Sequence, residues 1–223
     1  VNPRIFRYLG YSAYYNKNYD TALSSLTSFV SDPTNRVIGR DYFYIGASKL
    51  DKGLMATPID SVSINSGILD FKKGFDMSPS VAVELPEFGK KLFDKKLYVQ
   101  AASVYEIAIA NTETKTYLMD NFYFASSVYW SYYNLEILNE HQIEMLHKGD
   151  TALDVIIKAS PSTPDSYLFK ARIQALLKNS ALVTKSYEEF IAIAKTKKTE
   201  ELNSKGMKSK LIEAYNNLGL IYE

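Results

Sequence analysis

The sequence predicts an all-α protein built from consecutive helical hairpins, and three observations support this fold class. Apolar residues recur at helical spacing along most of the 223 residues. Strand patterns are almost absent, and the nearest one, at residues 81–83, is short. The order of large and small residues in the first hairpin returns later in the chain at a fixed offset. Repetition of this kind is typical of proteins made of stacked repeats.

The first hairpin follows from its apolar stripes and its breaks. One helical face runs from Ile5 to Tyr15, and the polar segment 16–18 interrupts it. A second stripe runs from Tyr19 to Val30 and ends at Asp32-Pro33, because proline cannot continue a helix. Two short helices joined by a tight polar turn form a helical hairpin.

The same hairpin recurs 79 residues later, where Gly10 aligns with Gly89, Tyr19 with Tyr98 and Ala22 with Ala101. The first copy carries, in order, Phe6, Leu9-Gly10, Tyr19, Ala22, Leu26, Phe29 and Pro33. The second carries Leu85, Phe88-Gly89, Leu92, Tyr98, Ala101, Tyr105 and Ala108. The segment Ala214–Tyr222 repeats the opening half once more. This pattern resembles the tetratricopeptide repeat (TPR) family.

The resemblance implies a single domain over residues 1–223, folded as a right-handed superhelical α-α solenoid of TPR-like hairpins with insertions. The expected repeats span residues 3–36, 39–81, 82–117, 118–163 and 164–211, followed by a half-repeat at 212–223. Small residues should lie where the two helices of a repeat approach closely, at Gly10, Gly46, Gly89, Ala125, Ala171 and Gly219. A half-repeat is a poor end for a solenoid, so we expect a further segment or another copy to cover it. Self-association through this half-repeat is therefore one expected interaction.

The composition narrows the function classes. Twenty-six Lys and Arg against 25 Asp and Glu give a net charge of +1, which argues against a strongly electrostatic nucleic-acid binder. No cysteine is present, and no apolar run approaches the length that spans a membrane. We expect no nucleic-acid partner and no membrane insertion. The chain does not begin with Met, which suggests a piece of a longer protein, and similarity to bacterial TPR proteins leaves cytoplasm and periplasm or cell envelope both open.

No pattern in the sequence points to catalysis. The only two histidines, in the segment His141–His147 with Glu144 between them, lie six residues apart and diverge around a helix. Nucleophile elbows, phosphate-binding loops and dinucleotide-binding glycine patterns are missing. The expectation is a protein that is not an enzyme, with no catalytic residue, no metal and no cofactor.

The aromatic residues carry the functional hypothesis. Eighteen Tyr, 11 Phe and one Trp gather in clumps, and the resemblance implies that first helices of the repeats line a concave face that binds a peptide. The expected partner-binding residues are Arg4, Arg7, Tyr8, Tyr11, Tyr15, Arg40, Phe43, Tyr44, Phe122, Tyr123, Tyr129, Trp130 and Tyr133. The alternative is that these rings fill the core.

The functional prediction is therefore a non-catalytic protein–protein interaction scaffold that binds a peptide or protein segment in an aromatic groove. The three arginines at one end favour a ligand that is partly apolar and partly acidic. The alternative is the sensor or regulatory portion of a larger multidomain protein, a signalling protein or a transcription regulator.

Overall fold

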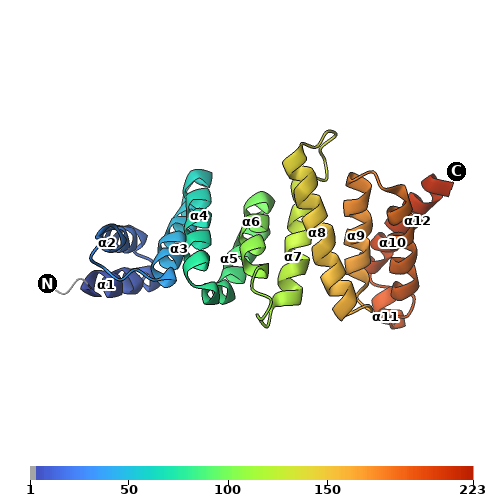
Figure 1. Ribbon diagram of the computed structural model, residues 1–223. Coiled ribbons are helices and arrows are strands. Elements are labelled where there is room, and N and C mark those ends of the chain that lie inside the picture. The colour runs from blue at the N-terminus through green and yellow to red at the C-terminus, as the bar shows by residue number, and fades with distance from the viewer. Residues whose placement is uncertain (1–3, 223) are drawn as a thin grey trace. The chain divides into compact units, whose positions relative to one another are not determined.

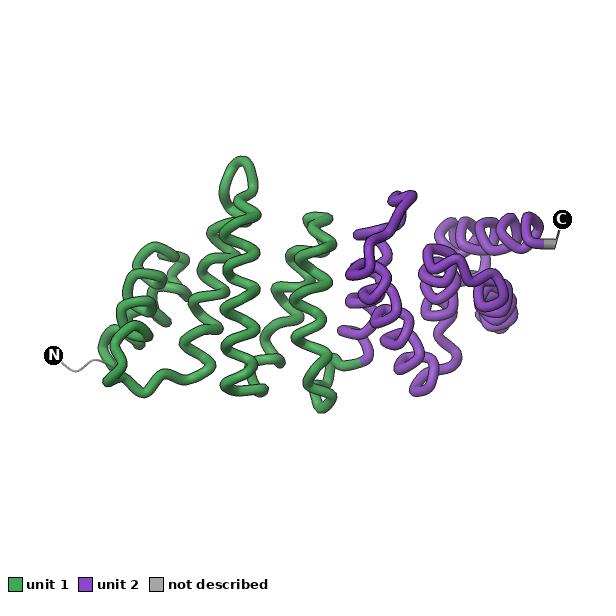
Figure 2. Tube along the Cα trace, turned by 45° about the horizontal axis from the view of Figure 1, so that its top comes forward, with its two compact units in different colours: residues 1–117 green, residues 118–223 purple. Residues whose placement is uncertain are grey.

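In the computed structural model, residues 4–222 are described, and they form helices joined by turns (Figure 1). No β-strand occurs in this range. The chain divides into two compact units, residues 1–117 and 118–223, coloured separately in Figure 2. The expected all-α architecture of helical hairpins is confirmed. The superhelical path of the repeats stays a prediction.

Unit 1 consists of three hairpins. Their helices are α1 (Arg4–Tyr15) with α2 (Tyr19–Ser31), α3 (Gly39–Met55) with α4 (Ser61–Met77), and α5 (Leu85–Asp94) with α6 (Tyr98–Ile109). A 3-10 helix, η1 (Pro79–Glu84), joins the second hairpin to the third. The segment 81–83, the nearest approach to a strand in the sequence, lies in this 3-10 turn.

Unit 2 contains two long hairpins and a terminal helix. Its elements are α7 (Tyr117–Tyr132), α8 (Glu140–Ala159), α9 (Pro164–Leu176), α10 (Ser180–Ala194), the short α11 (Thr199–Leu202) and α12 (Lys205–Tyr222). Helix α12 packs on α10. It begins at Lys205, where the Ser204 hydroxyl accepts a backbone hydrogen bond from Met207 at 3.2 Å. The half-repeat expected at residues 212–223 stays a prediction.

Three of the hairpins share one turn. Lys17, Lys96 and Lys178 have φ of 58°, 59° and 58°, each just after the first helix of its hairpin. The residue that follows each lysine donates its backbone N–H five residues back, as in Asn18 N to Ala13 O at 2.8 Å. This left-handed residue reverses the chain and satisfies carbonyls at the helix end.

Small residues set the separation of the paired helices. A Cβ on Gly10 would lie 2.4 Å from Leu26 Cγ, and one on Gly89 would lie 2.7 Å from the Tyr105 ring. In the second hairpin the backbones themselves meet, because a Cβ on Gly46 would lie 2.6 Å from the carbonyl oxygen of Gly67. The close-approach positions inferred from the sequence therefore do receive a side chain or backbone from the second helix in these hairpins.

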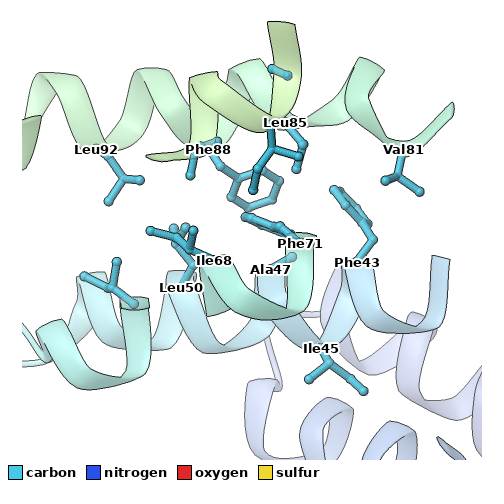
Figure 3. Close-up of a cluster of buried hydrophobic side chains, with 14 of the residues drawn as sticks. Phe43, Ile45, Ala47, Leu50, Ile68, Phe71, Val81, Leu85, Phe88 and Leu92 are labelled. Carbon is cyan, nitrogen blue, oxygen red and sulfur yellow. The ribbon is translucent and has the colours of Figure 1, made fainter. Parts of the chain in front are cut away.

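The core of unit 1 is aromatic at its centre. Figure 3 shows Phe43, Phe71 and Phe88 meeting between the second and third hairpins, with Phe43 and Phe71 stacked at a centroid distance of 5.5 Å and Phe71 and Phe88 at 5.0 Å. Leu50 and Leu85 lie around them and are fully buried. These contacts fix α3 and α5 side by side and so position the site described next.

Candidate functional site

An open cleft of about 1070 Å³ lies in unit 1 and is lined mainly by α1, α3 and α5, the first helices of the three hairpins. We call it the unit 1 cleft. Its aromatic and apolar lining is Tyr14, Tyr15, Tyr19, Phe43, Tyr44, Phe88, Leu54, Met55 and Val83. Its charged lining is Lys17, Lys91, Lys95, Asp51, Glu84, Glu87 and Asp94.

A tyrosine cluster forms one wall of the cleft. The Tyr44 ring lies 4.4 Å from Tyr11 and 5.3 Å from Tyr14, and its hydroxyl is 2.5 Å from that of Tyr15. Burial raises the pKa of Tyr44 above its ordinary value, and the hydrogen bond with Tyr15 adds to the rise. The wall is therefore neutral, and its exposed ring is that of Tyr15.

Most charges of the cleft are paired with one another. Lys91 lies 3.2 Å from Asp51 and 3.0 Å from Glu87, and the Tyr14 hydroxyl donates to Asp51 at 3.1 Å. Lys17 and Lys95 form no ion pair within the described residues. They are the cations that the cleft leaves available to a ligand.

Two of the predicted site residues, Arg7 and Tyr11, instead build a buried anchor with Asp41 between the first two hairpins. The Asp41 side chain is fully buried and accepts hydrogen bonds from Arg7 at 2.8 and 2.9 Å, from Tyr11 at 2.7 Å and from the Ile38 backbone at 2.8 Å. The Arg7 guanidinium also lies 4.5 Å from the Phe29 ring centroid. Arg7 and Tyr11 thus both donate inward to a buried carboxylate, and their part in partner binding stays a prediction.

Of three further predicted residues, Phe43 and Tyr44 are buried and Arg40 forms an ion pair. Phe43 and Tyr44 are only 2% and 3% exposed, because they pack against the second and third hairpins and against α1, so neither offers a free ring face. Arg40 pairs with Glu84 at 2.5 Å. Tyr15, at 69% exposure, is the predicted residue that presents a ring to the unit 1 cleft.

Arg4 and Tyr8 lie elsewhere on unit 1. Together with Arg7 and Phe29 they line a smaller hollow of about 450 Å³ beside the segment 34–38. Tyr8 is 64% exposed. The arginine-rich end expected from the sequence therefore does not form part of the unit 1 cleft.

The predicted residues of unit 2 form a separate aromatic cluster. Phe122 and Tyr129 contact Phe169 edge-on at 5.3 and 5.7 Å, and Trp130 lies 4.9 Å from Tyr129. Tyr123 lies beside Phe122 at 6.3 Å, and Tyr133, which is half exposed, lies 5.2 Å from Trp130; these two complete the predicted set.

An arginine that the sequence analysis did not single out organises this cluster. Arg172 lies 4.9 Å from the Phe169 ring and 5.5 Å from the Tyr129 ring, and it pairs with Glu213 at 2.8 and 2.6 Å. Burial lowers its pKa, but the hydrogen bond and charge of Glu213 outweigh that effect and the net shift is upward. Two structural residues, Arg172 and Asp41, were not singled out from the sequence, and the sequence holds one weak indication of each. Arg172 follows Ala171, a predicted close-approach position. Asp41 is the third residue of its helix, where a carboxylate can accept from free backbone N–H groups.

The described residues form neither a metal-binding cluster nor a membrane-spanning helix. Among residues 4–222, no group of three side chains suited to metal binding occurs, and His141, Glu144 and His147 do not converge. The helices of this range include none that is long and apolar enough to cross a membrane.

Comparison with known proteins gives loose structural similarities. No family model matches the sequence, and no curated protein matches it. The C-terminal part of a TPR repeat-containing protein from Cytophaga hutchinsonii is similar, with a TM-score of 0.45, 18% identity, and coverage of 99% of this chain and 83% of that one. PilW, a type IV pilus biogenesis factor, is similar with a TM-score of 0.44 and 13% identity, and the match covers 99% of this chain and 89% of PilW. A chain of the APC/C hetero-tetramer Cut9-Hcn1 is similar with a TM-score of 0.43 and 14% identity, and the match covers 92% of this chain and 34% of that one.

Proposed function

We propose that the protein is a non-catalytic interaction scaffold whose unit 1 cleft binds an extended peptide segment of a partner protein. The observation that carries the proposal is the set of apolar side chains left open in this cleft. Tyr15, Met55 and Val83 come from three different elements, line one hollow and are 69%, 70% and 63% exposed. Exposed apolar groups that gather in one cleft are a feature of binding sites.

The side chains that line the unit 1 cleft indicate which residue types its ligand should carry. Rigid tyrosine rings supply contact area to apolar side chains at low entropic cost, and their hydroxyls accept or donate to a peptide backbone. Lys17 and Lys95 favour a carboxylate on the same ligand. The expected ligand is therefore a segment with apolar residues and an acidic residue. Lys17 and Lys95, rather than Arg7 and Arg40, would contact the acidic residue, because both arginines already form ion pairs.

The test begins with a displayed library of random peptides selected against the protein. Affinities of the selected peptides are then measured for the parent, for Tyr15→Ala with Met55→Ser, and for Leu69→Ser. Leu69 is equally exposed, at 72%, but lies on α4 outside the cleft lining. We expect a loss of about tenfold or more, on the order of 1.4 kcal/mol, for the cleft variant and none for Leu69→Ser. Selected peptides that bind all three proteins equally would exclude the cleft as the binding site.

A further inference from the structure

A second hollow, of about 490 Å³, lies in unit 2 between the loop that joins α7 to α8 and the turn that joins α9 to α10. Figure 1 shows this loop and this turn at the same end of unit 2. The volume is within the range of small-molecule binding sites. Both walls come from the middle of the chain, residues 135–147 and 174–179, and each is continuous with described helices on both sides. We call it the unit 2 hollow.

The apolar lining of the unit 2 hollow is aliphatic. Ile137 is 87% exposed and Leu135 is 40% exposed, so the α7–α8 loop leaves large side chains uncovered where it lines the hollow. Among the described residues, no Phe, Tyr or Trp ring lines it, in contrast to the unit 1 cleft. The lining therefore favours a hydrocarbon chain. Its large aliphatic members are Leu135, Ile137, Leu138, Ile143, Leu176 and Leu177.

Both ends of the α7–α8 loop are held by hydrogen bonds. Leu135 donates its backbone N–H to the Tyr132 carbonyl at 3.0 Å, and the Asn139 side chain accepts from the Gln142 N–H at 2.9 Å and caps α8. The aliphatic residues between these two points are therefore fixed at the rim. The unit 2 hollow is formed before a ligand arrives.

Gln174 places a buried amide on the wall of the unit 2 hollow. This residue is 4% exposed, lines the hollow, and its side chain makes no hydrogen bond to any described residue. Buried polar groups in folded proteins nearly always have a partner, because leaving one unpaired costs free energy. An unpaired amide beside an aliphatic wall is therefore a place for the polar group of a ligand.

A cation lies on the same wall as this amide. Lys178 lines the hollow and forms no ion pair within the described residues. The Asn179 backbone N–H donates to the Gln174 carbonyl at 3.0 Å, which brings the turn that carries Lys178 back to Gln174. Glu136, the acidic residue of the lining, belongs instead to the α7–α8 loop. An amide N–H and an ammonium group that lie together bind a carboxylate.

We propose that the unit 2 hollow binds a small aliphatic carboxylic acid. Its hydrocarbon chain lies against the leucine and isoleucine side chains, and its carboxylate accepts hydrogen bonds from Gln174 Nε2 and Lys178 Nζ. A peptide segment fits less well, because its several backbone amides would need partners and the lining offers one buried amide. This site is distinct from the unit 1 cleft, since the two share no lining residue.

The probe is octanoate at neutral pH, and the two histidines are the reporters. His147 lines the hollow, whereas His141 does not, and the chain has no other histidine. Their imidazole signals in proton NMR, assigned with His141→Gln, measure binding to the parent, to Gln174→Met and to Lys178→Asn. Methionine keeps the length of glutamine without its amide. Asparagine tolerates the left-handed conformation of residue 178.

Octanoate should shift the signals of His147 and leave those of His141 in place. Each buried CH₂ group strengthens binding about fourfold, so butyrate should bind about tenfold more weakly or worse. Each of the two hollow variants should weaken octanoate binding about fivefold or more, because a charge-assisted hydrogen bond is lost. Gln174→Met should not lower the free energy of unfolding, because the amide has no partner within the protein to lose.

Four results would overturn the proposal. They are an unchanged His147 signal, octylamine binding as tight as octanoate binding, octanoate binding that neither variant weakens, and a loss of stability in Gln174→Met. The comparison ligand N-acetyl-dileucine carries the same carboxylate on a peptide. If it binds more tightly than octanoate, the hollow accepts a peptide terminus rather than a small aliphatic acid, and the proposal is likewise wrong.

Discussion

Gly46 and Gly67 lie so close that a Cβ added to either would stand 2.6 Å from the carbonyl oxygen of the other. Two further contacts of the same kind flank this pair along α3 and α4. A Cβ on Gly39 would lie 2.4 Å from the Gly74 carbonyl oxygen, and one on Gly53 would lie 2.9 Å from the Asp60 carbonyl oxygen. Backbone rather than side chain therefore sets the distance between α3 and α4, and backbone cannot move aside as a flexible side chain can.

Replacing Gly46 with alanine should destabilise the protein. Overpacking of this kind costs about 1–3 kcal/mol, and the clash outweighs the gain in helix propensity of about 1 kcal/mol. Urea unfolding followed by circular dichroism measures the change in the free energy of unfolding. The control is Gly219→Ala, where the new methyl group meets nothing and only the propensity gain applies. Equal effects from the two substitutions would show that α3 and α4 are not in backbone contact.

Removing the buried carboxylate of Asp41 should cost considerably more than removing an exposed one. Asp41→Ala leaves the Arg7 guanidinium without its ion pair and the Tyr11 hydroxyl without an acceptor. Breaking one partner of a buried ion pair costs about 3–5 kcal/mol. The matched control is Asp76→Ala, which removes an exposed pair with Lys72 and should cost less than about 0.5 kcal/mol. A small effect at Asp41, comparable with that at Asp76, would contradict the anchor between the first two hairpins.

The left-handed turn residues predict a stabilising substitution. Lys96 has φ of 59°, a conformation that costs a residue with a Cβ about 1–2 kcal/mol and costs glycine nothing. After the greater chain entropy of glycine is subtracted, Lys96→Gly should raise the free energy of unfolding by about 0.5–1 kcal/mol. Lys95, with φ of −83°, is the adjacent control. Lys95→Gly should lower stability, and a gain there as well would show that the turn conformation is not the cause.

The buried tyrosines predict a loss of stability at high pH. Burial, helped by neighbouring acids or hydroxyls, raises the pKa values of Tyr11, Tyr14, Tyr44 and Tyr187 in the folded protein. Above the ordinary tyrosine pKa of about 10, the unfolded chain loses these protons while the folded chain keeps them. The free energy of unfolding therefore falls as pH rises above about 10, by about 1.4 kcal/mol per pH unit for each retained proton, and is insensitive to these groups below it.

Urea unfolding at a series of pH values, together with tyrosinate absorbance, measures this effect. Tyr11→Phe removes one of the retained protons and should make the fall less steep. Titration of all 18 tyrosines in one step near pH 10, with the protein still folded, would contradict it.

The helical hairpins and the positions where their helices approach closely follow from the amino-acid sequence alone. Apolar periodicity and the breaks at residues 16–18 and at Pro33 define the helices of the first hairpin, and Gly10, Gly46 and Gly89 are close-approach positions in the structure as predicted. These features are local, because helix formation and a two-residue turn depend on residues within one or two turns of each other.

Which aromatic and basic side chains remain available to a partner depends on tertiary packing, which the sequence pattern does not reveal. Tyr15 and Tyr44 belong to neighbouring first helices and look equivalent in the sequence, yet Tyr15 is exposed and Tyr44 is buried against the tyrosine rings of α1. Arg7 likewise became a structural residue only when Asp41, 34 residues later, was brought beside it. Helical periodicity tells which residues share a face of a helix, but the neighbour that covers that face comes from another part of the chain.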